Sequence, residues 1–185
     1  MQKETYCAIN VLCTDPDGNV VGSEYPLSEL DVDSVWGQIK LRSEYERWGV
    51  NRTCVLKCFP FPEIVNEKFI SEGIVWNRIS LAYKAKFVNE KLRIYKPRTD
   101  GLSASSVKIR HNNPIGTRLY YFELFKLPVP VIVKLKAIVN YNRFSYGNIN
   151  LWHLLKGSPN FIMSLFFILP SYLLYLRDKF KYLLN

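Results

Sequence analysis

The chain has 185 residues and a net charge of +9 at pH 7, and 48 % of its residues are hydrophobic. This share of apolar side chains excludes an intrinsically disordered chain, and the length suits a domain with a sizeable core, since a domain commonly holds ~100–200 residues. Most of the charge lies near the C-terminus: residues 126–185 contain eight Lys or Arg and one acid, Asp178, and so carry +7 of the total (8 − 1).

The predicted elements up to residue 125 mix strands with helices. Alternation of apolar and polar side chains predicts strands, and apolar positions at helical spacing between Asn, Ser, Pro or Gly residues predict helices. In chain order we expect a strand at 5–13, a hairpin turn at 15–19 with a short strand at 20–21, helices at 34–48, 51–58 and 72–83, a strand at 85–95, and helices at 103–111 and 114–125.

These elements predict an α/β fold with few strands. Three convincing strands precede residue 100, whereas a stable parallel or mixed sheet usually has more strands and helices on both faces. We therefore expect residues 1–125 to form part of a larger mixed sheet flanked by helices, whose other strands lie elsewhere. Residues 126–185 are expected to form an α-helical tail that is both basic and apolar.

The tail begins with a predicted pair of basic amphipathic helices at 131–156, broken near 145–148, and continues with an apolar stretch at 161–176. A membrane-spanning helix needs ~20 apolar residues, and Pro170 would kink this one. Long apolar runs separate the charges, which argues against nucleic acid as a partner. Peripheral contact with an anionic membrane surface is favoured. A buried or oligomerising helix and a true span are the alternatives.

Side chains that could bind a metal or act as nucleophiles are scarce. The sequence has no glycine-rich phosphate loop, no nucleophile elbow and no histidine cluster with metal-ligand spacing. The pair Asp15–Asp17 lies in a predicted turn and the pair Asp31–Asp33 precedes a predicted helix, so both are interpreted as structural. The four cysteines are interpreted as reduced thiols. No metal ligand is predicted.

The most informative stretch runs from Glu67 to Arg78, with the sequence EKFISEGIVWNR. It places Glu72 at the start of a predicted helix, with Trp76 and Arg78 on the turns that follow. A carboxylate held beside an aromatic ring and a guanidinium suits proton abstraction near a charged leaving group. The structural alternative is a helix cap, with Ser71 as the capping residue and Glu72 stabilised by the helix dipole.

Several segments, in order, resemble the second half of the catalytic domain of family 2 glycosyltransferases, which have the GT-A fold. The segments are 47–57, 59–62, 67–79, 87–95, 100–103 and 113–116. Residues 6–22 are similar to the strand and hairpin that follow the nucleotide-binding half in that family. Residues 175–179 resemble its membrane-proximal tail. The resemblance covers most of the chain.

The resemblance implies transfer of a sugar from a nucleotide-sugar donor to a hydroxyl of a glycan or lipid-linked acceptor, as in polysaccharide biosynthesis. The family's base lies in a Glu-Asp pair that corresponds to Glu72 and Gly73. Because the aspartate, usually the base, is glycine here, Glu72 is the candidate general base. Substrate-binding roles are implied for four further residues. Trp76 and Arg78 lie on the helix behind the base, and Trp48 and Arg52 lie on the acceptor side.

The resemblance also implies a divalent cation, Mn²⁺ or Mg²⁺, which stabilises the leaving diphosphate. The family's Asp-x-Asp ligand motif and its nucleotide-binding strands would precede Met1. We therefore expect a truncated or split enzyme, whose missing parts a separate N-terminal half would supply, and a homo-oligomer is the other expected partner. The expected location is the cytoplasmic face of a membrane, as a peripheral protein. The alternative function is a non-catalytic, membrane-associated interaction module derived from such an enzyme.

Overall fold

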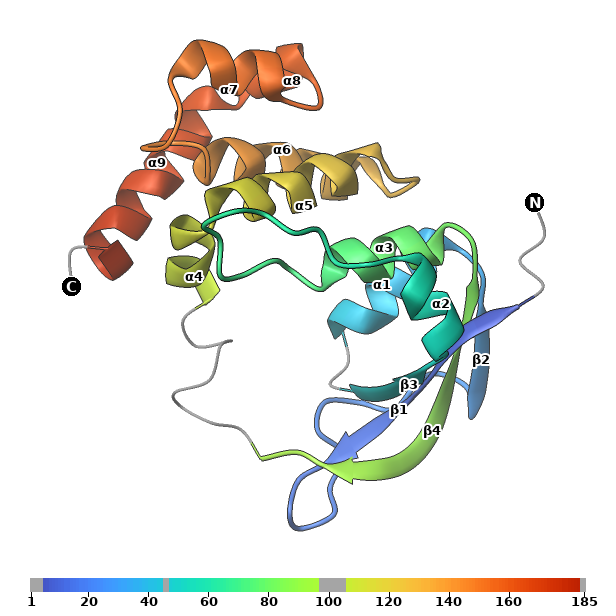
Figure 1. Cartoon of the computed structure of the whole chain (residues 1–185). Helices are drawn as coiled ribbons and strands as arrows, with labels where there is room; N and C mark the ends of the chain where they lie inside the picture. The colour runs from blue at the N-terminus through green and yellow to red at the C-terminus, as the bar shows by residue number, and fades with distance from the viewer. Residues whose placement is uncertain (1–4, 45–46, 97–105, 184–185) are drawn as a thin grey trace. The chain divides into compact units, whose positions relative to one another are not determined.

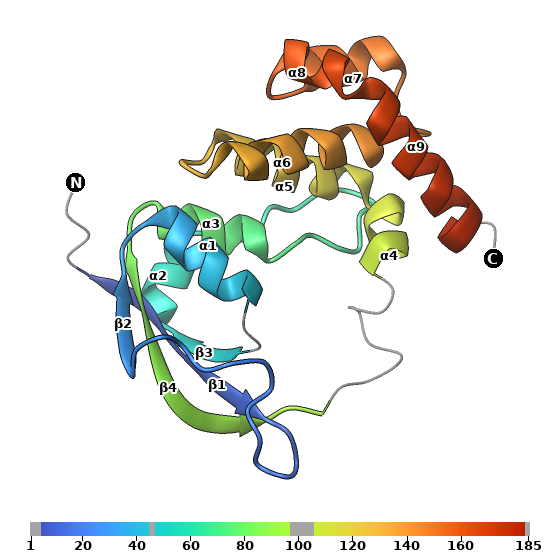
Figure 2. The same cartoon turned by 180° about the vertical axis from the view of Figure 1, so that it is seen from behind.

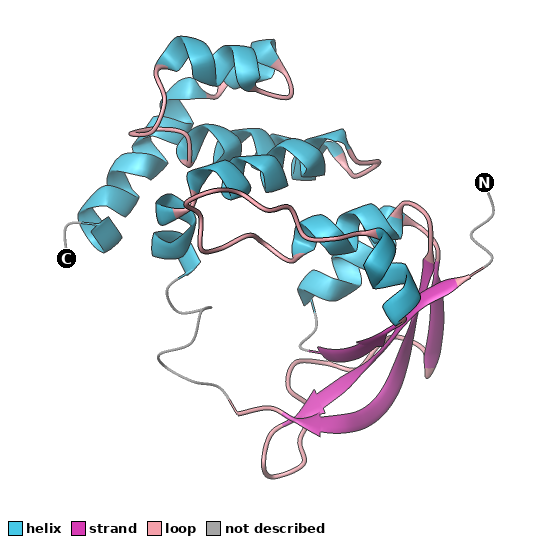
Figure 3. Cartoon of the chain, in the orientation of Figure 1, coloured by secondary structure: helices cyan, strands magenta, loops and turns pink. Residues whose placement is uncertain are grey.

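The computed structural model describes residues 5–44, 47–96 and 106–183. The chain divides into two compact units. Residues 1–60 and 75–98 make the first, here named the sheet unit, and residues 61–74 and 99–185 make the second, the helical unit. Figure 3 shows the described strands within the first unit and a succession of helices in the second.

The described part of the sheet unit contains four strands, β1 (Tyr6–Thr14), β2 (Glu29–Val32), β3 (Arg47–Asn51) and β4 (Lys84–Ile94). Their order is β2-β4-β1-β3, in which β1 and β4 are parallel and the two outer pairs are antiparallel. Three helices lie on one face of this sheet (Figure 1, Figure 2): α1 (Val35–Glu44), α2 (Thr53–Cys58) and α3 (Gly73–Ser80). The predicted α/β class, a mixed sheet flanked by helices, is confirmed.

The core of the sheet unit lies between the helices and the sheet. Phe87 of β4 and Leu12 of β1 are fully buried, and Val75 and Ile79 of α3 belong to the same cluster. β1 is buried along almost its whole length because it has a strand on either side. Burying an apolar side chain of this size stabilises the fold by about 1.5–3 kcal/mol, so the cluster holds α3 against the sheet.

The opposite face of β1 and β3 carries apolar side chains that stay exposed. Ile9 and Val50 are directly paired across the two strands and therefore point to the same side. Ile9 is 50 % exposed, Val50 is 59 % exposed, and Trp48, two residues earlier in β3, is 41 % exposed. β3 is also an edge strand of the four-stranded sheet. This face and edge together form a surface suited to a partner.

In the helical unit, a proline and capping asparagines set the starts of several helices. Pro114 starts α5 at a first-turn position, while Asn150 and Asn160 cap α7 and α8 by accepting hydrogen bonds from backbone N–H groups. The helices are α4 (Ser106–Asn112), α5 (Pro114–Lys126), α6 (Val131–Arg143), α7 (Leu151–Gly157), α8 (Phe161–Phe166) and α9 (Ile168–Asp178), followed by a π-helical turn (Lys179–Leu183).

A buried charge joins three of these helices. Asp178 at the end of α9 is fully buried. Its carboxylate lies 3.0 Å from His111 Nε2 of α4 and accepts hydrogen bonds from Arg143 Nε of α6 at 2.5 Å and from Arg177 at 3.2 Å. The cluster therefore fixes the end of α9 to α4 and α6.

Two differences from the predicted elements lie in the sheet unit. The helix expected at 34–48 ends at Glu44, and Trp48 and Val50 alternate along β3 instead, because the segment pairs with β1. Asp31, expected in a helix cap, lies in β2. There it accepts a hydrogen bond from the Tyr6 hydroxyl at 2.6 Å and pairs with Lys86 at 3.0 Å, so its role is still structural.

Residues 161–176 form two helices, α8 and α9, that meet at Phe167. Pro170 lies in the first turn of α9, where its missing N–H removes no helical hydrogen bond. No helix in the described ranges has the length and apolarity to cross a membrane. The expected helix start at Ser103 and the segment 100–103 lie outside the described residues.

Candidate functional site

The segment that leads into α3 is anchored by Asn113, between α4 and α5. The Asn113 amide oxygen accepts hydrogen bonds from the backbone N–H groups of Lys68 at 2.7 Å and Phe69 at 3.0 Å. The amide nitrogen donates to the Ile109 carbonyl at 2.8 Å, which fixes the orientation of the side chain. Asn113 is only 6 % exposed, so these hydrogen bonds are shielded from water.

Glu67 completes the anchor at the start of α5. Its carboxylate accepts hydrogen bonds from the N–H groups of Ile115 at 2.5 Å and Gly116 at 2.6 Å. First-turn N–H groups lack partners within the helix and carry partial positive charge, which favours a carboxylate there. A β-carbon at Gly116 would lie 2.9 Å from Glu67 Oε2, so glycine permits this approach. We name these four hydrogen bonds the Glu67–Asn113 clasp.

The clasp holds the chain just ahead of Glu72. Glu72 is exposed, directly precedes α3, and makes no hydrogen bond or ion pair with any other described residue. The backbone around it is fixed by the hydrogen bond from the Ile74 N–H to the Ser71 carbonyl at 3.1 Å. A free carboxylate on an anchored loop at a helix start can accept a proton from a bound molecule.

Gly73 leaves room for the ring of Tyr120 at the start of α3. A β-carbon at this position would lie 2.8 Å from the ring of Tyr120. The ring is itself held, because it packs edge-on against Tyr121 at 5.0 Å and lies under the Arg110 guanidinium at 5.8 Å. Any side chain at position 73 would therefore collide, and the carboxylate at this helix start comes from Glu72.

The other predicted site residues belong to the sheet unit, whereas Glu72 belongs to the helical unit. Trp48 lies in β3 and Arg52 directly after it, and both are exposed. Trp76 and Arg78 lie on α3 and are half-buried, with Trp76 packed against the hydrophobic core. Trp76 thus has a packing role, whereas Trp48 and Arg52 are the two predicted site residues of the sheet unit that are exposed.

Arg52 lies at a cavity of about 370 Å³ on the sheet unit. Tyr6 and Ile9 of β1 and Val50 of β3 also line this cavity, so it adjoins the exposed apolar face. Arg52 donates a hydrogen bond to the Tyr6 carbonyl at 3.4 Å, which draws the guanidinium toward β1. The volume falls within the range of small-molecule pockets, ~300–1,000 Å³. We name it the Arg52 pocket.

The expected divalent cation finds no ligand set in the described part of the chain, where no three His, Cys, Asp or Glu side chains are placed to hold a metal. Asp15 is used by its turn, where it accepts hydrogen bonds from the N–H groups of Asp17 at 3.0 Å and Asn19 at 2.9 Å. Asp31 is engaged within the sheet. These residues do not fit a cation site, and its ligands would have to come from elsewhere.

The sequence alone does not reveal that Glu67 accepts from the start of α5 or that Asn113 accepts from the backbone after Glu67. Both belong to segments that carry the family resemblance, but the segments lie more than forty residues apart in the chain. The signal available in the sequence was the Asn113–Pro114 pair, which marks a helix start. A helix start needs an acceptor for its free N–H groups, so an acceptor could be expected there. Nothing in the local pattern shows which acid supplies it.

Replacing Asn113 with alanine is expected to loosen the loop ahead of Glu72. The amides of Lys68 and Phe69 lose their acceptor, and because an unpaired, partly buried amide costs about 1–3 kcal/mol, their hydrogen exchange should become about 10-fold faster or more. Amide exchange measured by NMR checks this. Asn112→Ala is the matched control, since Asn112 is exposed. Unchanged exchange at Lys68 and Phe69 would contradict the clasp.

Comparison with known proteins gives no further guide to this site. Models of protein families, curated proteins and solved structures were compared with the chain, and none of them matches. The resemblance to family 2 glycosyltransferases therefore rests on the segments of the chain itself, and the function built on it is a proposal.

Proposed function

We propose that this chain forms the acceptor side of a family 2 glycosyltransferase of the GT-A type, which works at a membrane surface in glycan or polysaccharide synthesis. The observation that supports it best is the Glu67–Asn113 clasp, which joins two motif segments and presents Glu72 at the start of α3. The Glu72 carboxylate is exposed and makes no hydrogen bond or ion pair with the described residues, so it is accessible to a bound acceptor.

In this proposal Glu72 takes the proton of the acceptor hydroxyl while the hydroxyl oxygen attacks the anomeric carbon of the donor sugar. The new glycosidic bond forms as the bond from that carbon to the nucleotide diphosphate breaks, with inversion at the carbon. The proton then passes from Glu72 to water. General base catalysis of this kind typically contributes ~10²–10⁴-fold to a rate.

Trp48 and Arg52 are the proposed acceptor-binding residues. Trp48 is 41 % exposed, so its indole ring offers an apolar face to the C–H side of a sugar. Arg52 lines its pocket with N–H donors, which suit sugar hydroxyls or the phosphate of a lipid-linked acceptor. Trp76 and Arg78 are proposed to support the site from α3.

The nucleotide-sugar donor and the divalent cation are proposed to be held by a separate N-terminal half. The exposed side chains of Ile9, Trp48 and Val50 support a partner on the sheet unit, since exposed apolar side chains that lie together often mark an interaction site. The open edge at β3 supports it as well.

The test is sugar transfer. The tagged chain is isolated with its natural partners from its own cells and incubated with vesicles, Mn²⁺ or Mg²⁺, and a panel of radiolabelled nucleotide sugars. Label incorporated into glycan or lipid-linked products from one or a few donors supports the proposal. Failure of every donor, in a preparation that binds vesicles, favours the non-catalytic membrane-associated interaction module.

Membrane attachment is proposed for both functions because the helices after residue 150 have a reversed pattern. In α8, Ser164 is buried and donates a hydrogen bond to Asn142 at 2.6 Å, while Ile162 and Phe166 are each 78 % exposed. In α9, Ser171 is buried and Leu169 is 65 % exposed. Polar side chains inside and apolar ones outside favour an apolar environment around the helices.

Basic side chains accompany this apolar surface. Lys156 of α7, Arg177 of α9 and Lys179 just after it are exposed, and residues 126–185 carry +7. An anionic bilayer suits both features, because apolar side chains enter the boundary of headgroups and acyl chains while cations stay among the headgroups. We therefore propose peripheral attachment to the cytoplasmic leaflet, whose surface is negative.

Ile162→Asp and Phe166→Asp are each expected to weaken binding to anionic vesicles by about 10-fold or more, because each removes about 1.5–3 kcal/mol of apolar burial and adds a repelled charge. Vesicle co-sedimentation measures the effect. Leu92→Asp is the control, since Leu92 is a comparably exposed apolar residue, at 64 %, on β4. Equal losses in all three variants would place the contact outside α8.

A further inference from the structure

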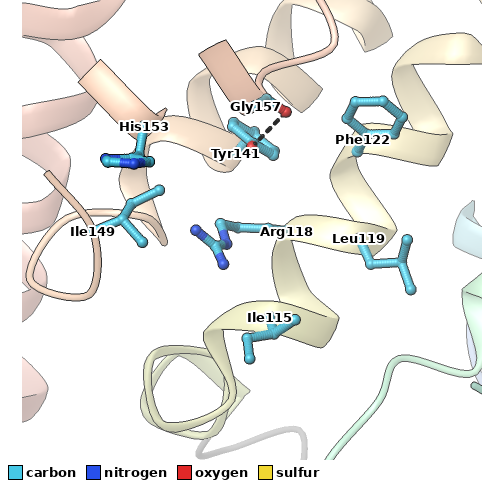
Figure 4. A pocket seen from close by; sticks show the side chains of 8 residues that line it. All are labelled: Ile115, Arg118, Leu119, Phe122, Tyr141, Ile149, His153 and Gly157. Atoms are coloured by element: carbon cyan, nitrogen blue, oxygen red, sulfur yellow. Dashed lines mark hydrogen bonds between the residues drawn. The ribbon is translucent and has the colours of Figure 1, made fainter. Parts of the chain in front are cut away.

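The helical unit contains a cavity of about 300 Å³ between α5, α6 and α7 that the proposed sugar transfer does not use. Figure 4 shows the side chains around it. Its apolar wall is made by Ile115, Leu119, Phe122 and Ile149. Arg118 and His153 also line it, and none of the described lining residues is acidic. We name this cavity the Arg118 pocket.

Arg118 carries a positive charge that no acidic side chain of the described residues pairs with. The side chain is half-buried and makes no hydrogen bond or ion pair with the residues that the structure describes. Figure 4 shows its guanidinium directed from α5 toward Ile149 and His153. A guanidinium has five N–H donors, and keeping it partly out of water without a partner is unfavourable. An anion in the pocket would satisfy it.

The other polar groups of the pocket are held in place. The Tyr141 hydroxyl donates to the Gly157 carbonyl at 2.8 Å and is therefore already used (Figure 4). The Asn150 side-chain oxygen accepts the backbone N–H of His153 at 2.9 Å and lies 2.7 Å from ring Nδ1 of the same residue. The imidazole is thereby oriented with its Nδ1–H donating to Asn150, so Nε2 of the neutral ring can accept a hydrogen bond from an O–H of a ligand, such as that of a phosphate monoanion.

We propose that the Arg118 pocket binds the phosphomonoester headgroup of a bilayer lipid. Arg118 supplies paired N–H donors to the phosphate oxygens, and His153 supplies a further contact. A headgroup with an ammonium group, such as choline or serine, finds no carboxylate among the lining residues. A bare phosphate needs only the donors that are present. The inference rests on the proposed membrane attachment and is independent of sugar transfer.

The surroundings of the pocket favour a lipid over free phosphate. Most of the lining side chains are apolar, among them Ile115, Leu119 and Phe122. A lipid whose phosphate binds Arg118 would place the apolar part next to its headgroup against this wall. Inorganic phosphate would leave the apolar wall of the pocket with nothing to bury.

Binding without a bilayer is the first test. The whole chain is titrated with dihexanoyl phosphatidic acid below its micelle concentration, and separately with inorganic phosphate, by calorimetry and by NMR of the Ile115 and Ile149 methyl groups. The short-chain lipid is expected to bind and to shift both methyl signals, and to bind more tightly than phosphate. Equal affinity for inorganic phosphate would overturn the lipid assignment, and unshifted methyl signals would overturn the pocket.

Arg118→Gln should weaken this binding by about 10- to 100-fold, as for loss of charge-assisted hydrogen bonds. Arg118→Lys keeps the charge but not the planar fork, so it should recover only part of the affinity. Circular dichroism checks that both variants keep their helices. Unchanged affinity in a folded Arg118→Gln variant would overturn the role of Arg118.

Vesicles provide the second test. The wild-type chain should prefer phosphatidylcholine vesicles with phosphatidic acid over vesicles with phosphatidylserine at the same surface charge, and Arg118→Gln should abolish this preference. Lys179→Gln, the control, should weaken both equally because it lowers only the general attraction. No headgroup preference in the wild type would overturn the proposal. If no vesicle is bound but the soluble lipid is, the membrane attachment fails and the pocket assignment stands.

Discussion

Replacing Glu72 with glutamine is expected to lower sugar transfer by about 10²–10⁴-fold. Glutamine has the same length as glutamate but cannot take up a proton, so the acceptor hydroxyl loses its base while the clasp stays intact. The fall should appear in kcat, and the KM of the nucleotide sugar should change little because Glu72 acts on the acceptor. Steady-state transfer with the donor found in the panel measures both constants.

Glu63→Gln is the matched control for Glu72. Glu63 is an exposed acid in the same loop, on the far side of the clasp, and its loss should leave transfer near the wild-type rate. Wild-type turnover in Glu72→Gln would remove Glu72 from the mechanism and leave it the structural role of an acid at a helix start. An equal loss in both variants would point to the general charge of the loop.

Asp178→Ala is expected to destabilise the helical unit by about 3–5 kcal/mol, the usual cost of breaking a buried ion pair from one side. Asp178 is fully buried, and its removal leaves Arg143, whose side chain is 12 % exposed, without its counter-charge. His111 loses its hydrogen-bond acceptor as well. Urea unfolding, monitored through the hydrogen exchange of α9 amides, measures the loss of stability.

Arg177→Gln separates burial from charge in this cluster. Arg177 contacts the same carboxylate, but its side chain is 59 % exposed, so its removal should cost at most about 1 kcal/mol. Losses of similar size in Asp178→Ala and Arg177→Gln would show that the carboxylate is solvated, in conflict with the packing described above.

The same cluster sets the pH dependence of stability. Burial, together with the nearby charge of Arg143, lowers the pKa of His111 and outweighs the hydrogen bond with Asp178, which would raise it. Burial alone would raise the pKa of Asp178, but the hydrogen bonds from Arg143 and His111 outweigh it and lower this pKa. In both cases the unfolded chain binds protons more readily, so stability should fall below about pH 6.5 and again below about pH 4. In Asp178→Ala the second fall in the urea midpoints should become smaller, and the part that remains comes from Asp15 and Asp31, whose pKa values are also lowered by hydrogen bonds.

The sequence predicted well the elements whose apolar residues recur at the regular spacing of a strand or helix. β1, β4 and α5 lie within a few residues of the expected ranges because their apolar spacing follows from the sheet or helix itself. β2 has only four residues, Glu29–Val32, and its existence depends on pairing with β4. The pairing strand lies more than fifty residues away in the chain, so the sequence of this short segment does not predict a strand.

The candidate site could be predicted only in part for a similar reason. The sequence placed Glu72 at a helix start, but the Glu67–Asn113 clasp depends on two distant segments meeting. Trp76 shows the opposite limit: an aromatic residue at helical spacing suits a pocket or a core, and its burial against the core decides between them. The exposure of Phe166 likewise follows from the tertiary fold.

The contact between Tyr120 and Gly73 also constrains how this sequence can evolve. An aspartate at position 73 would strike the ring, while loss of the ring alone would remove its contacts with Tyr121 and Arg110. Neither substitution is neutral by itself, so a side chain at position 73 requires a second change at position 120. The two positions are therefore coupled energetically.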